Sequence, residues 1–168
     1  MVDIADPVET IISVLKHSTT GLGTTGYEVT DDASTAVSIL VTYKLSVEEL
    51  KAIFGGSQDY DLVITVEKGE TEDKWIGLDT KQLTVPVILT LHLIDKWSAV
   101  GSSNKYLTAS LVRSKAENAI RKFIKDHTLT AGGGIHVWSG KTFKDEEDKS
   151  IRPILYKASI VTEAWFYY

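Results

Sequence analysis

The sequence predicts an α+β domain with a mostly antiparallel sheet and two main helices packed on one face of that sheet. Two segments repeat apolar residues at helical spacing, and several others alternate apolar and polar residues as strands do. Hairpin-like connections between neighbouring strand segments favour antiparallel pairing. The expected order is helix, strand, short helix, strand, strand, helix, strand, strand. No internal repeat or linker divides the chain, so residues 1–168 are expected to form a single domain.

Size and composition are those of an ordinary globular protein. The chain has 168 residues, of which 43% are hydrophobic and 24% are charged, and a domain of this size buries roughly 70% of its unfolded surface. No stretch approaches the roughly 20 apolar residues of a membrane helix, and residues 1–6 do not resemble a signal peptide. The absence of cysteine excludes disulfides and thiolate metal sites. The net charge of −5, with both signs interspersed, argues against nucleic acid as the main partner.

The first helix is predicted from Pro7 to about His17. Asp6 occupies the N-cap position, Pro7 begins the first turn, and Glu9 stands at the capping-box position. A loop rich in glycine and threonine follows at 19–26. The apolar face of this helix is formed by Val8, Ile11, Ile12 and Leu15.

Two strands flank a short helix in the next part of the chain. Residues 36–45 alternate as a strand, and residues 61–67 form a second strand. Between them, Ser46 caps a helix at 47–54, because Ser-Val-Glu-Glu supplies a capping box and Gly55 with its following glycine ends it.

A polar segment at 68–82 is predicted to be a long connection within a hairpin. Loops longer than about 12 residues are uncommon and are often functional. The large apolar residues of this loop are Trp75, Ile76 and Leu78.

The clearest strand signal follows at 83–94, where every second residue is apolar and one face is therefore continuously hydrophobic. Pro86 lies on the other face and has no N–H group, which suggests an edge position or a nearby strand start. The apolar residues of this strand are Leu83, Val85, Val87, Leu89, Leu91 and Leu93.

The C-terminal part is predicted to contain the major helix at 108–126, a short strand at 135–139, an acidic turn at 145–148 and a final long strand at 151–168. The buried stripe of the helix is expected to comprise Leu111, Val112, Ala116, Ala119, Ile120, Phe123 and Ile124. The final strand ends in aromatic residues on both faces, so some of them must pack outside the core. These outward aromatics are either the lid of an edge strand or part of a subunit interface.

Motifs for catalysis or ligand binding are incomplete. Residues 139–142 (Ser-Gly-Lys-Thr) resemble the end of a phosphate-binding loop, but Ile135 stands where its first glycine is needed and no helix follows, which favours a hairpin turn. The glycines at 132–134 precede a strand rather than a helix N-terminus, so no anion site is expected.

Metal-binding patterns are also missing. The acids at 59–61 and 145–148 lack the pattern of a calcium loop. None of the four histidines has zinc-ligand spacing, although His92 and His136 remain free to converge on one face of the sheet. No catalytic residue, metal ligand or cofactor is predicted, and we do not expect an enzyme. The histidines are His17, His92, His127 and His136.

The element order and several local patterns resemble the tail terminator (tail completion) proteins of long-tailed bacterial and archaeal viruses. The likeness rests on Lys74-Trp75, on 79–81 leading into the strand at 85–93, on the helix at 114–124 and on 150–156 with the strand after it. It covers the first helix and the chain from Lys74 onward. Residues 19–60 depart from the family pattern, and the region near 44–60 is interpreted as an insertion.

The resemblance implies a virion structural protein of the tail and neck that is assembled in the host cytoplasm. Such a protein forms a homo-oligomeric ring, usually a hexamer, which caps the tail tube and contacts the tube protein and the neck or connector proteins. Neither a membrane nor direct nucleic-acid binding is expected. The candidate interface residues are Trp75, Ile76, Leu78, Trp165, Tyr167 and Tyr168.

Two other interpretations stay open on the sequence. Another head-tail connector or neck assembly protein has the same topology, and topology alone does not separate these functions. A ligand-binding or enzymatic α+β domain, whose site converges only in space, is the second. A deep polar pocket would favour that domain, whereas a flat sheet and ring symmetry would favour assembly.

Overall fold

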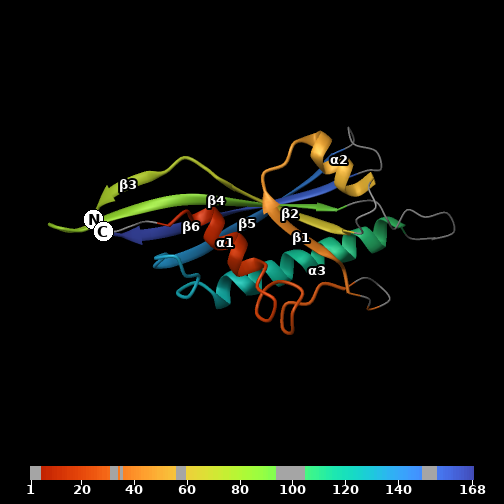
Figure 1. Cartoon of the computed structure of the whole chain (residues 1–168), viewed down its shortest axis with the longest axis horizontal. Coiled ribbons are helices and arrows are strands. Elements are labelled where there is room, and N and C mark those ends of the chain that lie inside the picture. Colours follow the sequence, from red (N-terminus) through yellow and green to blue (C-terminus); the bar gives the residue numbers. More distant parts are fainter. Residues whose placement is uncertain (1–4, 31–33, 35, 56–59, 94–104, 149–154) are drawn as a thin grey trace.

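A computed structural model describes residues 5–30, 34, 36–55, 60–93, 105–148 and 155–168. Within this part of the chain, six strands form one sheet in the order β1-β2-β4-β6-β5, and β3 also pairs with β4 (Figure 1). All pairs are antiparallel except β1 with β2. The protein is therefore an α+β domain with a mostly antiparallel sheet, as predicted. The strands are β1 (Ile39–Tyr43), β2 (Leu62–Lys68), β3 (Glu72–Trp75), β4 (Lys81–Leu93), β5 (Val137–Asp148) and β6 (Leu155–Tyr167).

The described residues contain three helices beside the sheet: α1 (Pro7–Leu15), α2 (Val47–Gly55) and α3 (Lys105–Asp126). The two main helices, α1 and α3, lie on one face, as predicted, and α2 lies on the other side of the sheet (Figure 1). The predicted N-caps Asp6 and Ser46 are confirmed. The Val8 N–H donates to the Asp6 side chain at 3.0 Å, and Ser46 and Glu49 exchange side-chain to backbone hydrogen bonds at 2.8 and 3.2 Å.

The core lies between α1, α3 and the sheet face that they cover, which we call the helix face. On β4 it consists of Val85, Val87, Leu89, Leu91 and Leu93, as the alternation predicted. The predicted stripe of α3 is correct for its described members except Leu111, which is 38% exposed. Leu111 points about 100° around the helix axis from the buried Val112, at the margin of the stripe.

The pairing of β1 with β2 is the parallel exception in the mostly antiparallel sheet. These strands are parallel, with Ile39 opposite Leu62 and Tyr43 opposite Val66. A parallel pair requires a crossover connection, usually containing a helix. The segment 44–60 provides this connection and includes α2. Its interpretation as an insertion relative to the viral family stays a prediction.

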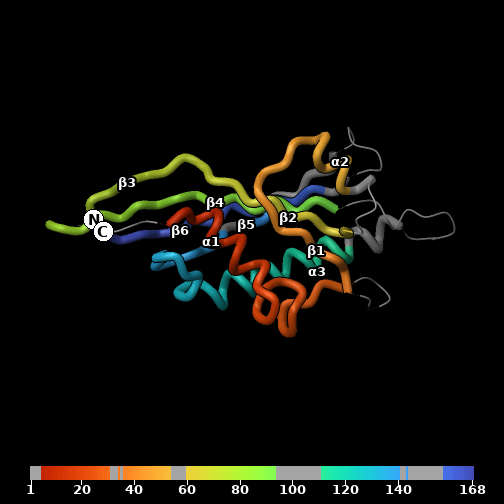
Figure 2. The backbone as a smooth tube through the Cα atoms, in the orientation of Figure 1, coloured from red at the N-terminus to blue at the C-terminus, as the bar shows by residue number. Residues whose placement is uncertain are grey.

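The predicted long loop at 68–82 contains a strand, β3, and the start of β4. Figure 2 shows the chain bowing away after β2 and running along β4 again as β3. Glu72 lies opposite Thr84 and Trp75 opposite Lys81, and the Ile76 N–H donates to the Thr80 carbonyl at 3.1 Å to close the turn. Sequence periodicity does not predict β3, because its four residues, Glu-Asp-Lys-Trp, are all exposed and do not alternate between apolar and polar side chains.

The expectation that Pro86 marks an edge or a strand start is wrong, because β4 lies inside the sheet and Pro86 lies mid-strand. Its carbonyl accepts from the Gly69 N–H at 2.9 Å, so its nitrogen faces the break between β2 and β3. A Cβ at Gly69 would lie 3.0 Å from the Pro86 Cβ. The proline is tolerated because the backbone N–H that it lacks would face the gap between β2 and β3, where the strand-to-strand hydrogen bonds are interrupted.

Strand β5 is longer than the short strand expected at 135–139. It continues through a register shift between Gly140 and Phe143, a β-bulge, and residues 145–148 pair with 158 to 155. The predicted turns at 139–142 and 145–148 are therefore strand. The sequence misleads here because an edge strand pairs on one side only and needs little apolar alternation. The start of the predicted final strand, 151–154, lies outside the described residues.

Candidate interaction surface at the hairpin end of the sheet

The fold brings together two predicted interface segments that are about 90 positions apart in the sequence. The backbones of Lys81 and Tyr168 exchange hydrogen bonds of 2.7 and 3.0 Å, and Gln82 lies opposite Tyr167. The β3–β4 turn thus lies beside the C-terminal end of β6 and extends past it (Figure 1). We call this region, residues 72–82 and 165–168, the hairpin end.

Large apolar side chains are exposed at the hairpin end. Leu78 is 98% exposed, Trp75 62%, Ile76 49% and Tyr168 41%. Trp165 and Tyr167 are half-buried on the opposite face of the sheet, across from Thr84 and Gln82. Clustered apolar groups that remain in contact with water are typical of surfaces that bind another molecule.

The interpretation of the terminal aromatics as an edge-strand lid is wrong, because β6 lies between β4 and β5. Of the terminal aromatics 165–168, Phe166 is buried in the core, whereas Tyr168 is 41% exposed, so fewer than the expected half pack there. Trp165 and Tyr167 project from the outer face, the face opposite the helix face. There the His136 ring meets the Tyr167 ring edge-on, with 5.1 Å between centroids. Sequence reasoning missed this role of His136.

Polar contacts hold the aromatic side chains of the hairpin end. The Tyr168 hydroxyl donates to Asp73 Oδ2 at 2.7 Å. Lys81 Nζ lies 3.6 Å from the same oxygen and 4.7 Å from the centre of the Trp75 ring, a cation–π arrangement. These contacts link β3, β4 and the residue that follows β6, so the surface has a defined shape before any partner binds.

The Tyr168–Asp73 hydrogen bond gives a testable pH dependence. It raises the pKa of the Tyr168 phenol above its usual value of 10.0, with desolvation and the carboxylate charge adding to it. The bond therefore stabilises the fold below pH 10 and is lost as pH rises through the raised pKa. We expect Asp73→Asn to lower the pKa of Tyr168, measured by NMR titration of the tyrosine ring carbons. Tyr27, whose pKa is raised by Asp126, is the internal control. An unchanged Tyr168 pKa would contradict the bond.

The histidines do not converge. His92 lies opposite Lys157 and its Nε2 is 3.1 Å from the Thr65 hydroxyl, whereas the His136 N–H donates to the Trp165 carbonyl. These β6 positions are eight residues apart, or about 26 Å along a strand. Within the described residues, no three potential metal ligands come together.

The helices in the described part of the chain are all too short or too polar to cross a membrane.

The two glycine-containing motifs have structural positions. Residues 139–142 lie at the bulge of β5. Glycines 132–134 have φ between 60° and 85° and form the turn after α3, where a Cβ at Gly133 would collide with Thr10. An L-residue rarely adopts such angles, so these glycines are required by the backbone.

The fold and this surface define an α+β domain with an exposed apolar end suited to association. The sequence matches no protein-family model, and no curated protein matches it significantly.

Proposed function

We propose that this protein is a virion structural protein, a tail terminator whose copies form a ring that caps a tail tube and joins it to the neck. The observation that carries the proposal is the hairpin end, where Trp75, Ile76 and Leu78 project into water from a paired hairpin. Six copies are expected in the ring. The role is structural rather than catalytic, and the tube and neck proteins are the expected partners.

The physical argument concerns the cost of exposed apolar surface. Burying such surface contributes roughly 25 cal/mol per Å², so contact of the hairpin end with a complementary surface on a neighbouring subunit or on the tube favours association. A closed ring needs two different, complementary patches on each subunit. A hairpin that extends past one end of the sheet supports this geometry, because it can reach a neighbouring subunit or the tube while the helix-covered core stays intact.

The test is the mass of the protein in solution, by light scattering across protein and salt concentration, with negative-stain electron microscopy of the same samples. We expect closed rings, either in the free protein or at the ends of added tail tubes. A protein that stays monomeric at high concentration and does not bind tube ends would contradict the proposal.

Replacing Leu78 by aspartate is expected to weaken ring assembly about 30-fold, which corresponds to the ~2 kcal/mol of an interface hot spot. Because Leu78 is 98% exposed, the substitution should leave the stability of the monomer within about 0.5 kcal/mol. The measurement is the concentration at which half of the protein is assembled.

The matched control is Val47→Asp, at an apolar residue of α2 that is 42% exposed and lies outside the hairpin end. It should assemble as the unmodified chain does. Equal assembly of Leu78→Asp and the unmodified chain would exclude the hairpin tip from the interface.

A further inference from the structure

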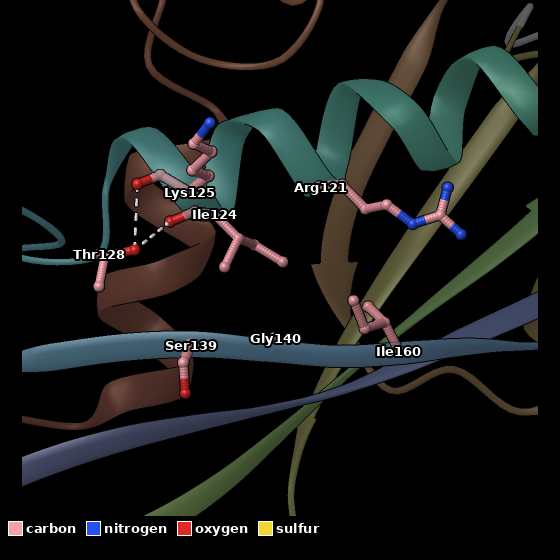
Figure 3. Close-up of a pocket in the computed structure, with 7 residues that line it drawn as sticks. All are labelled: Arg121, Ile124, Lys125, Thr128, Ser139, Gly140 and Ile160. Atoms are coloured by element: carbon pink, nitrogen blue, oxygen red, sulfur yellow. Dashed lines mark hydrogen bonds between the residues drawn. The ribbon is translucent and has the colours of Figure 1, made fainter.

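A groove of about 380 Å³ lies between the C-terminal half of α3 and the edge strand β5 (Figure 3). Its position coincides with the bulge of β5, where the register shifts between Gly140 and Phe143. A Cβ at Gly140 would lie 3.1–3.2 Å from the Ile160 and Ile124 side chains, so the glycine lets both isoleucines pack against β5. The lining residues are Arg121, Ile124, Lys125, Thr128, Ser139, Gly140 and Ile160.

The groove has an apolar floor and a positive rim. Ile124 and Ile160 form the floor, and the turn at its end carries Leu129, which is 74% exposed. On the rim, Arg121 is partly neutralised by Glu117, with 3.6 Å between their charged atoms. Lys125 is exposed and forms no ion pair with any described residue. This surface suits an apolar side chain next to a carboxylate.

Acidic groups on the packed elements either have other partners or lie further along the sheet: the acids of β5, at 145–148, begin five residues after Gly140, about 17 Å along the strand. On β6, Glu163 lies opposite Ser139, but it is on the outer face and accepts from the Trp165 indole at 3.3 Å. On α3, Asp126 accepts from the Tyr27 hydroxyl at 2.8 Å. From residue 113 to 126, α3 carries five cationic residues and two acidic ones, a local charge of +3 in a chain of net charge −5.

The tip of the β3–β4 hairpin has the complementary chemistry. Leu78, almost fully exposed, is followed directly by Asp79, which forms no ion pair within the described residues. Four acidic and two basic residues lie between 69 and 81, a local charge of −2. The tip therefore presents an exposed apolar side chain beside an available carboxylate.

We propose that the hairpin tip of one copy, residues 76–79, docks in the α3–β5 groove of the next copy. This deepens the proposed function, on which it rests, by assigning the two patches of the ring contact. The tip cannot reach its own groove. Ser139 lies opposite Glu163, whereas the turn begins beside Tyr168, five residues or about 17 Å further along β6. Leu78 enters the groove over the two isoleucines, and Asp79 pairs with Lys125 of the neighbour. Such a contact is heterologous, the kind of contact that generates a ring when the rotation between neighbouring copies closes.

Disulfide trapping tests the contact directly, because the chain has no cysteine of its own. The double variant Leu78→Cys, Thr128→Cys places one thiol at the tip and one in the groove. Mild oxidation should give a ladder of linked chains that ends in a closed ring. The control, Leu78→Cys with Val47→Cys on α2, should give no ladder. Rings without a ladder for the first variant would overturn the docking contact and leave the ring proposal standing. Chains that assemble neither when free nor at the ends of added tail tubes would overturn both.

A charge exchange provides a second measurement that does not depend on a groove thiol. Lys125→Glu and Asp79→Lys should each weaken assembly about tenfold, because each places like charges together. The double variant Lys125→Glu, Asp79→Lys should recover assembly, which a merely damaged fold would not do. Failure of the double variant to recover would overturn the pairing. Binding of an acidic peptide or oligonucleotide to the unassembled chain, with no effect of Asp79→Lys on assembly, would assign the groove to another anion.

Discussion

Replacing Trp138 by alanine is expected to lower the free energy of unfolding by about 3–5 kcal/mol, the range for truncating a large buried aromatic residue. Trp138 is fully buried on β5 and meets the Phe123 ring of α3 edge-on, with 6.3 Å between centroids. Its loss would leave a cavity where the major helix packs on the sheet. Urea denaturation followed by circular dichroism measures the effect, at protein concentrations low enough to keep the chains apart.

The indole of Trp138 also completes a buried hydrogen-bond chain. Its Nε1–H donates to the Thr162 hydroxyl at 2.9 Å, and that hydroxyl donates to the Val87 carbonyl at 2.6 Å. Thr162→Ser keeps these bonds and should cost much less than Thr162→Val, which leaves a buried donor and a buried acceptor unpaired at about 1–3 kcal/mol each. Equal stability of the two Thr162 variants would contradict the role of the hydroxyl.

The second large effect is expected for Gly21→Ala, with a loss of about 3 kcal/mol, near the upper end for inserting a methyl group where there is no space. Gly21 is buried in the turn after α1. A Cβ there would lie 2.6 and 2.7 Å from the backbone oxygen and nitrogen of His17, and would also collide with the Leu15 carbonyl. That carbonyl accepts the Leu22 N–H at 2.9 Å, so the turn would have to open and move α1.

Gly77→Ala is the matched control for this substitution. Gly77 lies in the hairpin turn, where the nearest atom to an added Cβ is the Thr80 Cβ at 4.0 Å. Its stability should change by less than about 0.5 kcal/mol, as for most surface positions. Thermal or urea denaturation of both variants gives the comparison. A Gly21→Ala protein as stable as Gly77→Ala would show that the turn adapts at little cost.

Features fixed by local chemistry were predictable from the sequence. The Asp6 cap, the Ser46–Glu49 capping box and the apolar face of β4 all follow from residues close together in the chain, and the structure contains each of them. Features set by distant pairing were not. The parallel register of β1 with β2, the exposed strand β3 and the second half of β5 depend on partners that sequence periodicity does not identify.

The candidate surface also combines features that the local sequence predicts with features that depend on distant pairing. Trp75 and Leu78 could be predicted as interface residues because large apolar residues are unusual in a polar segment. Tyr167 could be predicted because aromatics on both faces of a strand cannot all be buried. Their proximity was not predictable, since it follows from the register of β4 with β6. The groove was invisible to sequence reasoning for a related reason. It forms at the β5 bulge, and the residues of the bulge, 140–143, have the sequence pattern of a turn.

The position of β6 between β4 and β5 has a consequence for how the molecule folds. Leu93 pairs with Tyr156, 63 positions later, and Gln82 with Tyr167, 85 positions later. The β4–β6 pair in the middle of the sheet therefore cannot form from a local hairpin. The chain must first lose the conformational entropy of closing a long loop. Until β6 inserts, the backbone groups of β4 on that side have no strand partner, and the helix face lacks the apolar side chains of β6. Folding is expected to be slow for a chain of this size. It is also expected to be cooperative, because β6 must insert between β4 and β5 to complete the sheet.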